Sequence, residues 1–435
     1  SRNKSMKMKY LLAACTAFFL VSCSNDDEPQ PSPQYGDIVG LNIKDAKYIY
    51  TSGSNTRSSS AEYRQIKKDG RDMELSWIDS KGDTIKISGN PKIWNINKKY
   101  LMINTGVPIN YQPKYDEDGD RLPDSTPLGG YSYLIDKTTE AIYDLAEGLN
   151  GENAVTDNKG NIYAVDNSTG AVLFKIHTQD AANLKLELYA KASTSHKTPF
   201  VVNNKGICFY DYRYIRPSYG TQQFIISNFI SGTEYGNAFV SHDNEDMYIT
   251  AINSSLEEGK SNLIVSKLKE NKEIQSEVMA ELSFDGIWQS QMSDGIQVKW
   301  NDRRGTMLIH LYRYNESTYE YLLATKTLTK IPVNLGGFFT KDYSTYITTN
   351  ALYAQKSVNK LDIIALEDYS TKTLDLSGKG IDFRSIYTME GSDLLYFAGF
   401  QYSTSQSVIG TIDIDGNIEI SESTPNPITN IIQIN

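Results

Sequence analysis

The sequence predicts an all-β fold from its aromatic content and its pattern of short runs. The chain has 435 residues, 39% of them hydrophobic, and it contains 30 tyrosines and 14 phenylalanines. Aromatic side chains favour strands because they suit pleated, half-buried surfaces. From Tyr35 onward, short runs rich in Ile, Val, Tyr, Thr and Leu alternate with clusters of Gly, Asn, Asp and Ser. This alternation is typical of strands joined by turns, and no long helical pattern interrupts it.

A hairpin made of an apolar strand, a polar turn and a second apolar strand recurs along the chain. Its copies lie at 73–88, 131–145, 171–190, 223–235, 262–282, 319–335, 361–377 and 408–423, of which the copy at 223–235 is degenerate. The turns recur about every 48 residues, which is the length of a four-stranded propeller blade. The repeat therefore predicts a single β-propeller of four-stranded antiparallel blades, eight by count, with seven as the alternative count and a β-sandwich pair as the alternative fold.

Two further short strands precede most of the hairpins, as at 153–166, 200–212, 239–252 and 383–400. The first blade lacks an inner strand, whereas the tail at 428–434 has no partner of its own. One blade cannot bury both of its faces, so blades stack radially and the ring closes to protect its edges. We therefore expect the C-terminal strand to complete the first blade and to close the ring.

The N-terminal segment is typical of an export signal. Lys7 and Lys9 precede an apolar run from Tyr10 to Val21, which is too short to span a bilayer. The tetrad Leu20-Val21-Ser22-Cys23 resembles the lipobox of bacterial lipoproteins, which implies cleavage after residue 22 and acylation of Cys23. The alternative is an ordinary signal peptide with a chance cysteine.

A polar tether follows the cysteine and leads into the predicted propeller. The acidic run Ser24-Asn25-Asp26-Asp27-Glu28 resembles the tag that directs Bacteroidota lipoproteins to the outer face of the outer membrane, although any polar linker could have this composition. Pro29, Pro31 and Pro33 then stiffen the segment. We expect three parts: a signal peptide (1–22), a lipidated tether (23–34) and a propeller (35–435), with the protein anchored in the outer membrane and facing the cell exterior.

Charge and cysteine content exclude some classes of protein. The formal charge is −10, and loss of four basic residues with the signal peptide would make it −14. This acidity, without a basic stretch, argues against a nucleic-acid partner. Of three cysteines, only Cys208 lies in the predicted folded part, so an intrachain disulfide is not expected there.

Motifs for catalysis are missing, which favours a binding protein over an enzyme. The sequence has no metalloprotease, nucleophile-elbow, phosphate-loop or paired-cysteine signature. His310 lies in an apolar run and is expected in the core, and His242 is expected in a turn. Carboxylates brought together from different blades could still perform acid–base chemistry, so enzymatic activity stays open.

One acidic loop has the spacing of a calcium site. Asp116, Asp118, Asp120 and Asp124 alternate in the run Tyr115–Asp124, and such oxygen ligands suit Ca²⁺. The spacing resembles the calcium loops of thrombospondin type 3 repeats over nine residues. Arg121 replaces the expected glycine, and Pro127 stands where a bidentate acid is usual. A solvated acidic loop is the alternative.

The connections between the second and third strands of all blades open on one face of a propeller, and here these connections are enlarged. We expect them at 52–61, 105–129, 213–221, 253–261, 313–318 and 400–406. They combine tyrosine with arginine, which can stack on flat rings and bind anionic oxygens. The predicted ligand-binding residues are Tyr212, Arg213, Tyr214, Arg216, Tyr219, Arg313, Tyr314 and Tyr402. The alternative is that tyrosines cover blade edges and arginines pair with acids.

Trp94 and Trp288 are expected on innermost strands, where packing between blades is favoured over lining of a central channel.

The leader and blade plan together resemble the surface β-propeller lipoproteins of Bacteroidota that capture cobalamin or siderophores for TonB-dependent outer-membrane transporters. This resemblance implies a non-enzymatic role: the protein would hold a small ligand, such as a ferric siderophore or a similar anionic, ring-bearing nutrient, and pass it to the transporter. No ligand-binding residue of those families can be matched to a position here. The alternatives are a glycan-binding or glycan-processing propeller and a propeller for protein interaction or adhesion.

Overall fold

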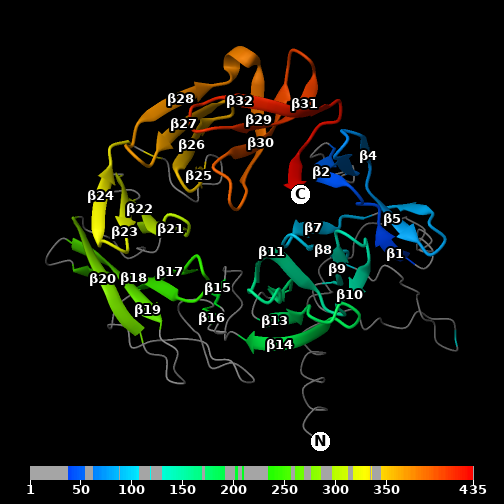
Figure 1. Ribbon diagram of the computed structural model, residues 1–435, viewed down its shortest axis with the longest axis horizontal. Helices are drawn as coiled ribbons and strands as arrows, with labels where there is room; N and C mark the ends of the chain where they lie inside the picture. Colours follow the sequence, from blue (N-terminus) through cyan, green and yellow to red (C-terminus); the bar gives the residue numbers. More distant parts are fainter. Residues whose placement is uncertain are drawn as a thin grey trace, which may run out of the picture.

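The computed structural model of the chain describes residues 38–53, 62–87, 89–106, 118, 130–168, 172–191, 201–203, 208–209, 234–255, 260–268, 276–285, 296–311, 317–333, 335 and 344–434. These residues form antiparallel sheets that follow one another around a ring (Figure 1). No helix long and apolar enough to cross a membrane occurs among them. The prediction of an all-β fold is confirmed.

Seven of the sheets in the described part have four strands each, and we name them as blades in chain order. Blade 1 contains β33 (Asn430–Gln433), β2 (Ala46–Ser52), β3 (Glu62–Lys67) and β4 (Asp72–Glu74). Blade 2 contains β7 (Lys92–Asn95), β8 (Tyr100–Asn104), β9 (Ser132–Asp136) and β10 (Ile142–Asp144). Blade 3 contains β11 (Leu149–Thr156), β12 (Ile162–Asp166), β13 (Val172–His177) and β14 (Lys185–Lys191).

The second half of the ring repeats this plan. Blade 5 contains β17 (Glu234–Val240), β18 (Met247–Ser255), β19 (Lys260–Leu268) and β20 (Ser276–Asp285). Blade 6 contains β21 (Ile296–Asn301), β22 (Thr306–Leu311), β23 (Ser317–Leu322) and β24 (Thr327–Ile331). Blade 7 contains β25 (Thr345–Ile347), β26 (Ala351–Ser357), β27 (Lys360–Ala365) and β28 (Thr371–Asp375). Blade 8 contains β29 (Ile381–Thr388), β30 (Leu395–Gln401), β31 (Gln406–Ile412) and β32 (Ile418–Thr424).

A two-stranded sheet occupies the remaining position, which we name blade 4. It contains β15 (Val201–Val202) and β16 (Cys208–Phe209). It lies between blades 3 and 5 in the chain, and β15 contacts the first strand of blade 5. The predicted hairpin at 223–235 lies outside the described residues. Seven complete blades and this pair make the eight positions that the repeat predicts.

The first strands of neighbouring blades contact one another around the middle of the ring. Such contacts join β33 to β7, β7 to β11, β15 to β17, β17 to β21, β25 to β29 and β29 to β33. Figure 1 shows β7, β11, β17, β21 and β25 towards the centre of the molecule. A ring of inner strands with the remaining strands outside them is the architecture of a β-propeller.

Burial follows this radial plan. All the residues of the second strands β8 and β22 are buried, because each of these strands lies between two neighbouring blades. By contrast, four of the five residues of the outer strand β24 are exposed. Each large apolar cluster is shared by neighbouring blades. Tyr353 and Ile363 of blade 7, for example, pack with Phe383 and Phe397 of blade 8.

The C-terminal strand closes the ring as expected. β33 pairs with β2 in antiparallel register, so that residues near both ends of the chain share one sheet. Side chains reinforce this junction from blades 2 and 8. Asn95 donates to the Gln433 carbonyl at 2.9 Å, and Tyr387 donates to the Gln433 side-chain oxygen at 2.8 Å. Lys137 donates to the Ile434 carbonyl at 3.0 Å.

The first hairpin, at 73–88, forms with its turn near residue 81, but its expected place in blade 1 is wrong. Only β4 stays in blade 1, whereas the following segment pairs with the N-terminal strand in a separate three-stranded sheet of β1 (Ile38–Leu41), β5 (Ser76–Asp79) and β6 (Thr84–Lys86). The Asn42 side chain diverts the chain, since its Oδ1 accepts from the Ser76 amide at 2.8 Å and from Gln65 at 2.9 Å. At Gly40, where β1 meets blade 2, a Cβ would lie 2.7 Å from the Glu140 carbonyl oxygen. The absence of a side chain at Gly40 permits this close approach.

Candidate functional site: the face of the second-to-third-strand connections

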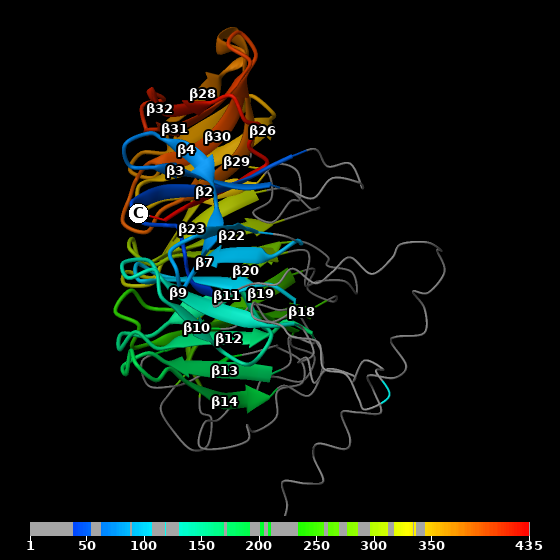
Figure 2. The same ribbon diagram turned by 90° about the vertical axis from the view of Figure 1, so that its right-hand side faces the viewer.

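Six enlarged segments are expected from the sequence. Five of them span or adjoin connections between the second and third strands of a blade: β2–β3, β8–β9, β18–β19, β22–β23 and β30–β31. The sixth, at 213–221, lies outside the described residues. Because adjacent strands of each blade are antiparallel, all connections between second and third strands lie on one side of the ring. We call this side the binding face. In Figure 2, β14 ends on the right, on this face, whereas the C-terminus lies on the opposite face.

Most of the predicted binding residues lie outside the described part of the chain. They are Tyr212, Arg213, Tyr214, Arg216, Tyr219, Arg313 and Tyr314. Tyr402 is described, and it lies on the binding face in the turn between β30 and β31. Its side chain is 56% exposed, which makes it available to a ligand.

The structure brings three residues of blade 8 around Tyr402, and we call the four together the Arg384 cluster (Asp382, Arg384, Phe400, Tyr402). The Tyr402 hydroxyl donates to Asp382 Oδ2 at 2.8 Å. The rings of Phe400 and Tyr402 meet edge to face, with centroids 5.0 Å apart. The Arg384 guanidinium lies 6.0 Å from the Phe400 ring centroid. Arg384 is not among the residues predicted from the sequence, because it lies within the inner strand β29 and not in a connection.

Local backbone structure positions Tyr402. A 3₁₀ turn (Ser377–Lys379) ends at Gly380, whose φ of 62° lies in the left-handed region that glycine adopts without strain. The Gly380 carbonyl then accepts a hydrogen bond from the Tyr402 amide at 2.9 Å. This bond ties the entry of β29 to the turn after β30, so Asp382 and Tyr402 meet although 20 residues separate them.

Arg384 lines a cavity of about 440 Å³ between blades 7 and 8 on the binding face. Its other walls include Tyr346, Gln355 and Phe383. Burial raises the pKa of Tyr346, so its phenol stays protonated and can donate a hydrogen bond. Among the described residues, Arg384 forms no ion pair. An exposed guanidinium with aromatic neighbours and no bound carboxylate can accept an anionic, ring-bearing ligand.

A second cavity on the binding face, of about 430 Å³, lies between the inner strands of blades 1, 2 and 3. Its walls combine Tyr63 and Trp94 with the exposed side chains of Lys92 and Glu152. Trp94 packs against the core shared by blades 2 and 3, and a Cβ at Gly151 would lie 2.9 Å from its ring. Trp94 therefore packs between blades, as expected, and also lines this cavity. Trp288 lies outside the described residues.

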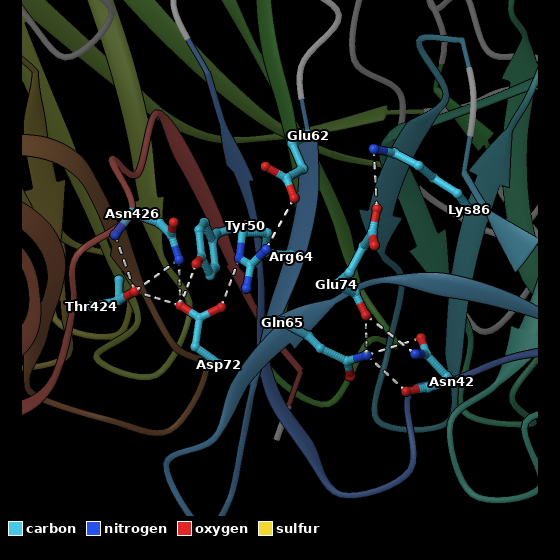
Figure 3. A network of polar contacts seen from close by, with 10 residues as sticks. All are labelled: Asn42, Tyr50, Glu62, Arg64, Gln65, Asp72, Glu74, Lys86, Thr424 and Asn426. Carbon is cyan, nitrogen blue, oxygen red and sulfur yellow. Dashed lines mark hydrogen bonds and ion pairs between the residues drawn. The ribbon is translucent and has the colours of Figure 1, made fainter. Parts of the chain in front are cut away.

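A polar network at the junction of blades 1 and 8 contains ionisable groups but has a structural role (Figure 3). The Asp72 carboxylate accepts hydrogen bonds from Arg64 Nε at 2.8 Å, from Thr424 at 2.5 Å, from Asn426 at 3.3 Å and from the Tyr50 hydroxyl. Burial alone would raise the pKa of Asp72, but hydrogen bonds from Thr424, Tyr50 and Arg64 outweigh it and lower the pKa. Both carboxylate oxygens are therefore engaged, and the group holds blade 8 to blade 1.

The same network keeps its tyrosine protonated. Burial, together with the neighbouring Asp72 carboxylate, raises the pKa of Tyr50 to about 12. The phenol therefore stays protonated at physiological pH and donates a hydrogen bond to Asp72. Sequence reasoning missed this network, because Asp72 and Thr424 are 352 residues apart and the sequence contains no signal that joins them.

The histidines that are described follow expectation. His310 is fully buried on β22, and its Nδ1 lies 2.8 Å from the Thr318 hydroxyl, which confirms it as a core residue. His242 lies in the turn after β17 and contacts Asp302 at 3.2 Å.

Of the predicted calcium ligands, only Asp118 belongs to the described residues, where it lies exposed in a turn. Asp116, Asp120 and Asp124 lie outside them, as does Cys23. Within the described ranges, no group of three or more His, Cys, Asp or Glu residues has the geometry to hold a metal ion. The calcium loop and the lipidation site stay predictions.

Comparison with known proteins gives similarity at the level of the fold. No protein-family model matches the sequence, and no curated protein matches it. The structure is similar to that of a puromycin hydrolase S511A mutant complexed with PGG, with 10% identity, a TM-score of 0.41, and coverage of 91% of this chain and 56% of that one. The chain thus spans little more than half of that protein.

Two further similar structures come from named bacteria. One is a putative 6-phosphogluconolactonase from Bacteroides fragilis NCTC 9343, with 10% identity, a TM-score of 0.39, and coverage of 93% of this chain and all of that one. The other is TolB from Acinetobacter baumannii, with 9% identity, a TM-score of 0.33, and coverage of 88% and 83%. The protein is a β-propeller, and that assignment rests on its own sheets and inner-strand contacts.

Proposed function

We propose that this protein is a non-enzymatic surface lipoprotein that binds a compact, anionic, ring-bearing ligand on its binding face and passes it to a TonB-dependent outer-membrane transporter. Ferric siderophores are the first candidates. The observation that carries the proposal is Arg384, which lines a cavity of about 440 Å³ and has Phe400 beside it. A cavity of this size falls in the range of small-molecule sites.

The chemistry of the cluster suits such a ligand. Arg384 supplies a planar cation that can bind two anionic oxygens at once, and it forms no ion pair with the described residues that would compete. Phe400 and Tyr402 supply aromatic surface beside it. The chain carries a net charge of −10, but salt screens distant charges beyond about 8–10 Å, so the local arginine dominates at the site.

The test is calorimetry of the protein with a panel of ferric catecholates, cobalamin, haem and oligosaccharides. We expect binding of an anionic ring-bearing member, and Arg384→Gln should weaken it by about ten- to a hundredfold, the cost of a lost charge-assisted hydrogen bond. Arg71→Gln is the matched control, because Arg71 lies in the β3–β4 turn on the opposite face and pairs with Asp69 at 2.7 Å. Binding that both variants weaken equally would contradict the assigned site.

A glycan ligand is the second candidate, and the cavity between blades 1, 2 and 3 favours it. There Tyr63 and Trp94 offer rings for stacking, and Asn95, Glu152 and Asn430 offer polar groups for sugar hydroxyls. If oligosaccharides alone bind and Trp94→Ala abolishes the binding, the function belongs to this cavity. If the whole panel fails to bind, a protein partner on the binding face is favoured.

The proposed anchoring at Cys23 rests on the leader sequence and has its own test. Cys23→Ala should give an unprocessed or soluble protein, whereas the native protein should fractionate with the outer membrane. Protease added to intact cells should digest the native protein, because the proposal places it on the outer face. Protection of the native protein in intact cells would contradict the surface location.

A further inference from the structure

A third cavity opens on the face opposite to the binding face. It has a volume of about 300 Å³ and lies where the C-terminal ends of β21, β25 and β29 converge. Three neighbouring blades, 6, 7 and 8, contribute its walls. The cavity lies outside the site proposed above, although Tyr346 lines both it and the cavity of the Arg384 cluster.

Lys299 is one of the charged residues that line this cavity. Its neighbours on β21, Val298 and Trp300, pack into the core shared by blades 5 and 6. Side chains alternate along a strand, so Lys299 lies on the other face of β21, towards blade 7. Its amine makes no hydrogen bond or ion pair with any residue in the described ranges. Burial lowers the pKa of Lys299.

Two buried lysines of this protein differ from the half-buried Lys299 in their partners. The Lys67 amine donates to the carbonyls of Asn42 at 2.7 Å and Lys44 at 2.6 Å. The Lys137 amine donates to the carbonyls of Asn97 at 2.6 Å and Ile434 at 3.0 Å. These two ammonium groups therefore have structural partners, whereas Lys299 lines a cavity with its amine uncompensated. Removing a charge from water without a partner is costly, and an anionic ligand would offset that cost.

The mouth of the cavity supplies a second cation. Gly391 has a φ of +83°, and a Cβ there would lie only 2.6 Å from Arg303 Nη2, so the glycine makes room for this guanidinium. Two acids, Asp302 and Glu390, also lie on the rim. Asp302 Oδ2 lies 3.2 Å from Nδ1 of His242, which belongs to the neighbouring blade 5. Lys299 thus supplies a positive charge inside the cavity, whereas the rim carries charges of both signs.

We propose that this cavity binds the carboxylate or phosphate group of a small organic molecule, with Lys299 as the interior counter-ion and Arg303 at the mouth. The volume is larger than a bare phosphate or acetate ion and lies at the lower end of small-molecule sites. The anionic group therefore belongs to a larger molecule, and the hydroxyl groups of Thr349 and Thr388 on the walls can bond to its polar parts.

The test uses three probes: inorganic phosphate, acetate, and benzoate, which adds a ring to the same carboxylate. Calorimetry and thermal shift on the full chain should detect binding of at least one probe. Lys299→Met should weaken that binding by at least tenfold. It should also raise the melting temperature of the free protein, because it removes a desolvated charge without removing a partner.

The matched control is Lys330→Met, which removes the same charge from the exposed outer strand of the same blade. We expect its affinity for the probes to stay within about twofold of the native value, since distant exposed charges are screened. Equal weakening by both variants, or no binding of any probe to the native protein, would overturn the proposal. Stronger binding of benzoate than of acetate would assign the carboxylate to a ring compound, and stronger binding of phosphate would assign a phosphate ester.

Discussion

The Asp72 network and the Arg384 cluster contain the same three residue types in opposite states. In the network, Arg64 donates to Asp72 at 2.8 Å, and their side chains are only 19% and 17% exposed. In the cluster, Arg384 lies over Phe400 and forms no ion pair among the described residues. The comparison separates charges that the fold has already paired from charges that are available to a ligand. Paired groups hold the ring together, and unpaired groups on a cavity can bind.

The largest expected effect tests the structural half of this comparison. Asp72→Ala should lower the free energy of unfolding by about 2–4 kcal/mol, because it removes the partly buried ion pair with Arg64 and the hydrogen bonds from Tyr50 and Thr424. Asp382→Ala, the equivalent change in the Arg384 cluster, should cost less than about 0.5 kcal/mol. Urea unfolding of both variants measures the difference. Equal losses would mean that the two carboxylates have the same role.

The two tyrosines sharpen the comparison. Tyr50→Phe should cost about 1.5 kcal/mol of stability, since it removes a hydrogen bond to a buried carboxylate. Tyr402→Phe should leave stability almost unchanged, because the Tyr402 hydroxyl bonds to Asp382 at the exposed surface. It should instead weaken ligand binding on the binding face. A loss of stability in Tyr402→Phe similar to that in Tyr50→Phe would contradict the distinction.

The acidic loop extends the comparison to carboxylates that are predicted to bind a metal ion. The predicted calcium ligands are Asp116, Asp118, Asp120 and Asp124. If they bind calcium, a calcium concentration ten times the dissociation constant should add about 1.4 kcal/mol to the free energy of unfolding by mass action. The melting temperature should rise accordingly. Asp118→Ala should abolish this shift, whereas Glu367→Ala, which removes an exposed acid from blade 7, should preserve it. Absence of a shift at millimolar calcium would indicate a solvated loop.

The smallest effect is a pH dependence of the Asp72 network. The pKa of Asp72 is lowered in the folded state, so its carboxylate stabilises the fold above the ordinary pKa of 3.8. This contribution is lost as the pH falls from there through the lower, folded-state pKa. Asp72→Asn should therefore have a flatter dependence of unfolding free energy on pH below about 4 than the native protein. Parallel curves for the two proteins would contradict the assignment.

The hairpin repeat shows how much of the fold can be predicted from local sequence pattern. The hairpin repeat correctly predicts the third and fourth strands of six blades, because alternating apolar residues and turn residues are close in sequence. The hairpin at 73–88 forms as β5 and β6 but lies outside blade 1, because Leu75 and Ser76 follow β4 without a turn signal, and the Asn42 side chain redirects the chain there. That contact comes from 34 residues away, and no local pattern reports it.

For the candidate site, the sequence predicts which connections share a face but not which residues meet on it. Tyr402 was found because it lies in a connection between second and third strands. Arg384 was missed because it lies on β29 and not in a connection, and the pairing of β29 with β30 brings it beside Phe400 and the turn after β30. Lys299 was missed for a related reason: its uncompensated charge depends on which blades surround it, not on its neighbours in sequence.

The sequence by itself determined the strand-rich fold, the blade repeat and the closure by the tail at 428–434, because periodicity and turn residues act over short distances. Only the tertiary structure decided which charges are paired. Asp72 finds Thr424 across 352 residues, whereas Arg384 and Lys299 find no ion-pair partner in the described part of the chain. The physical reason is that pairing depends on desolvation and on distances of a few ångströms between blades, which are defined only when the ring closes.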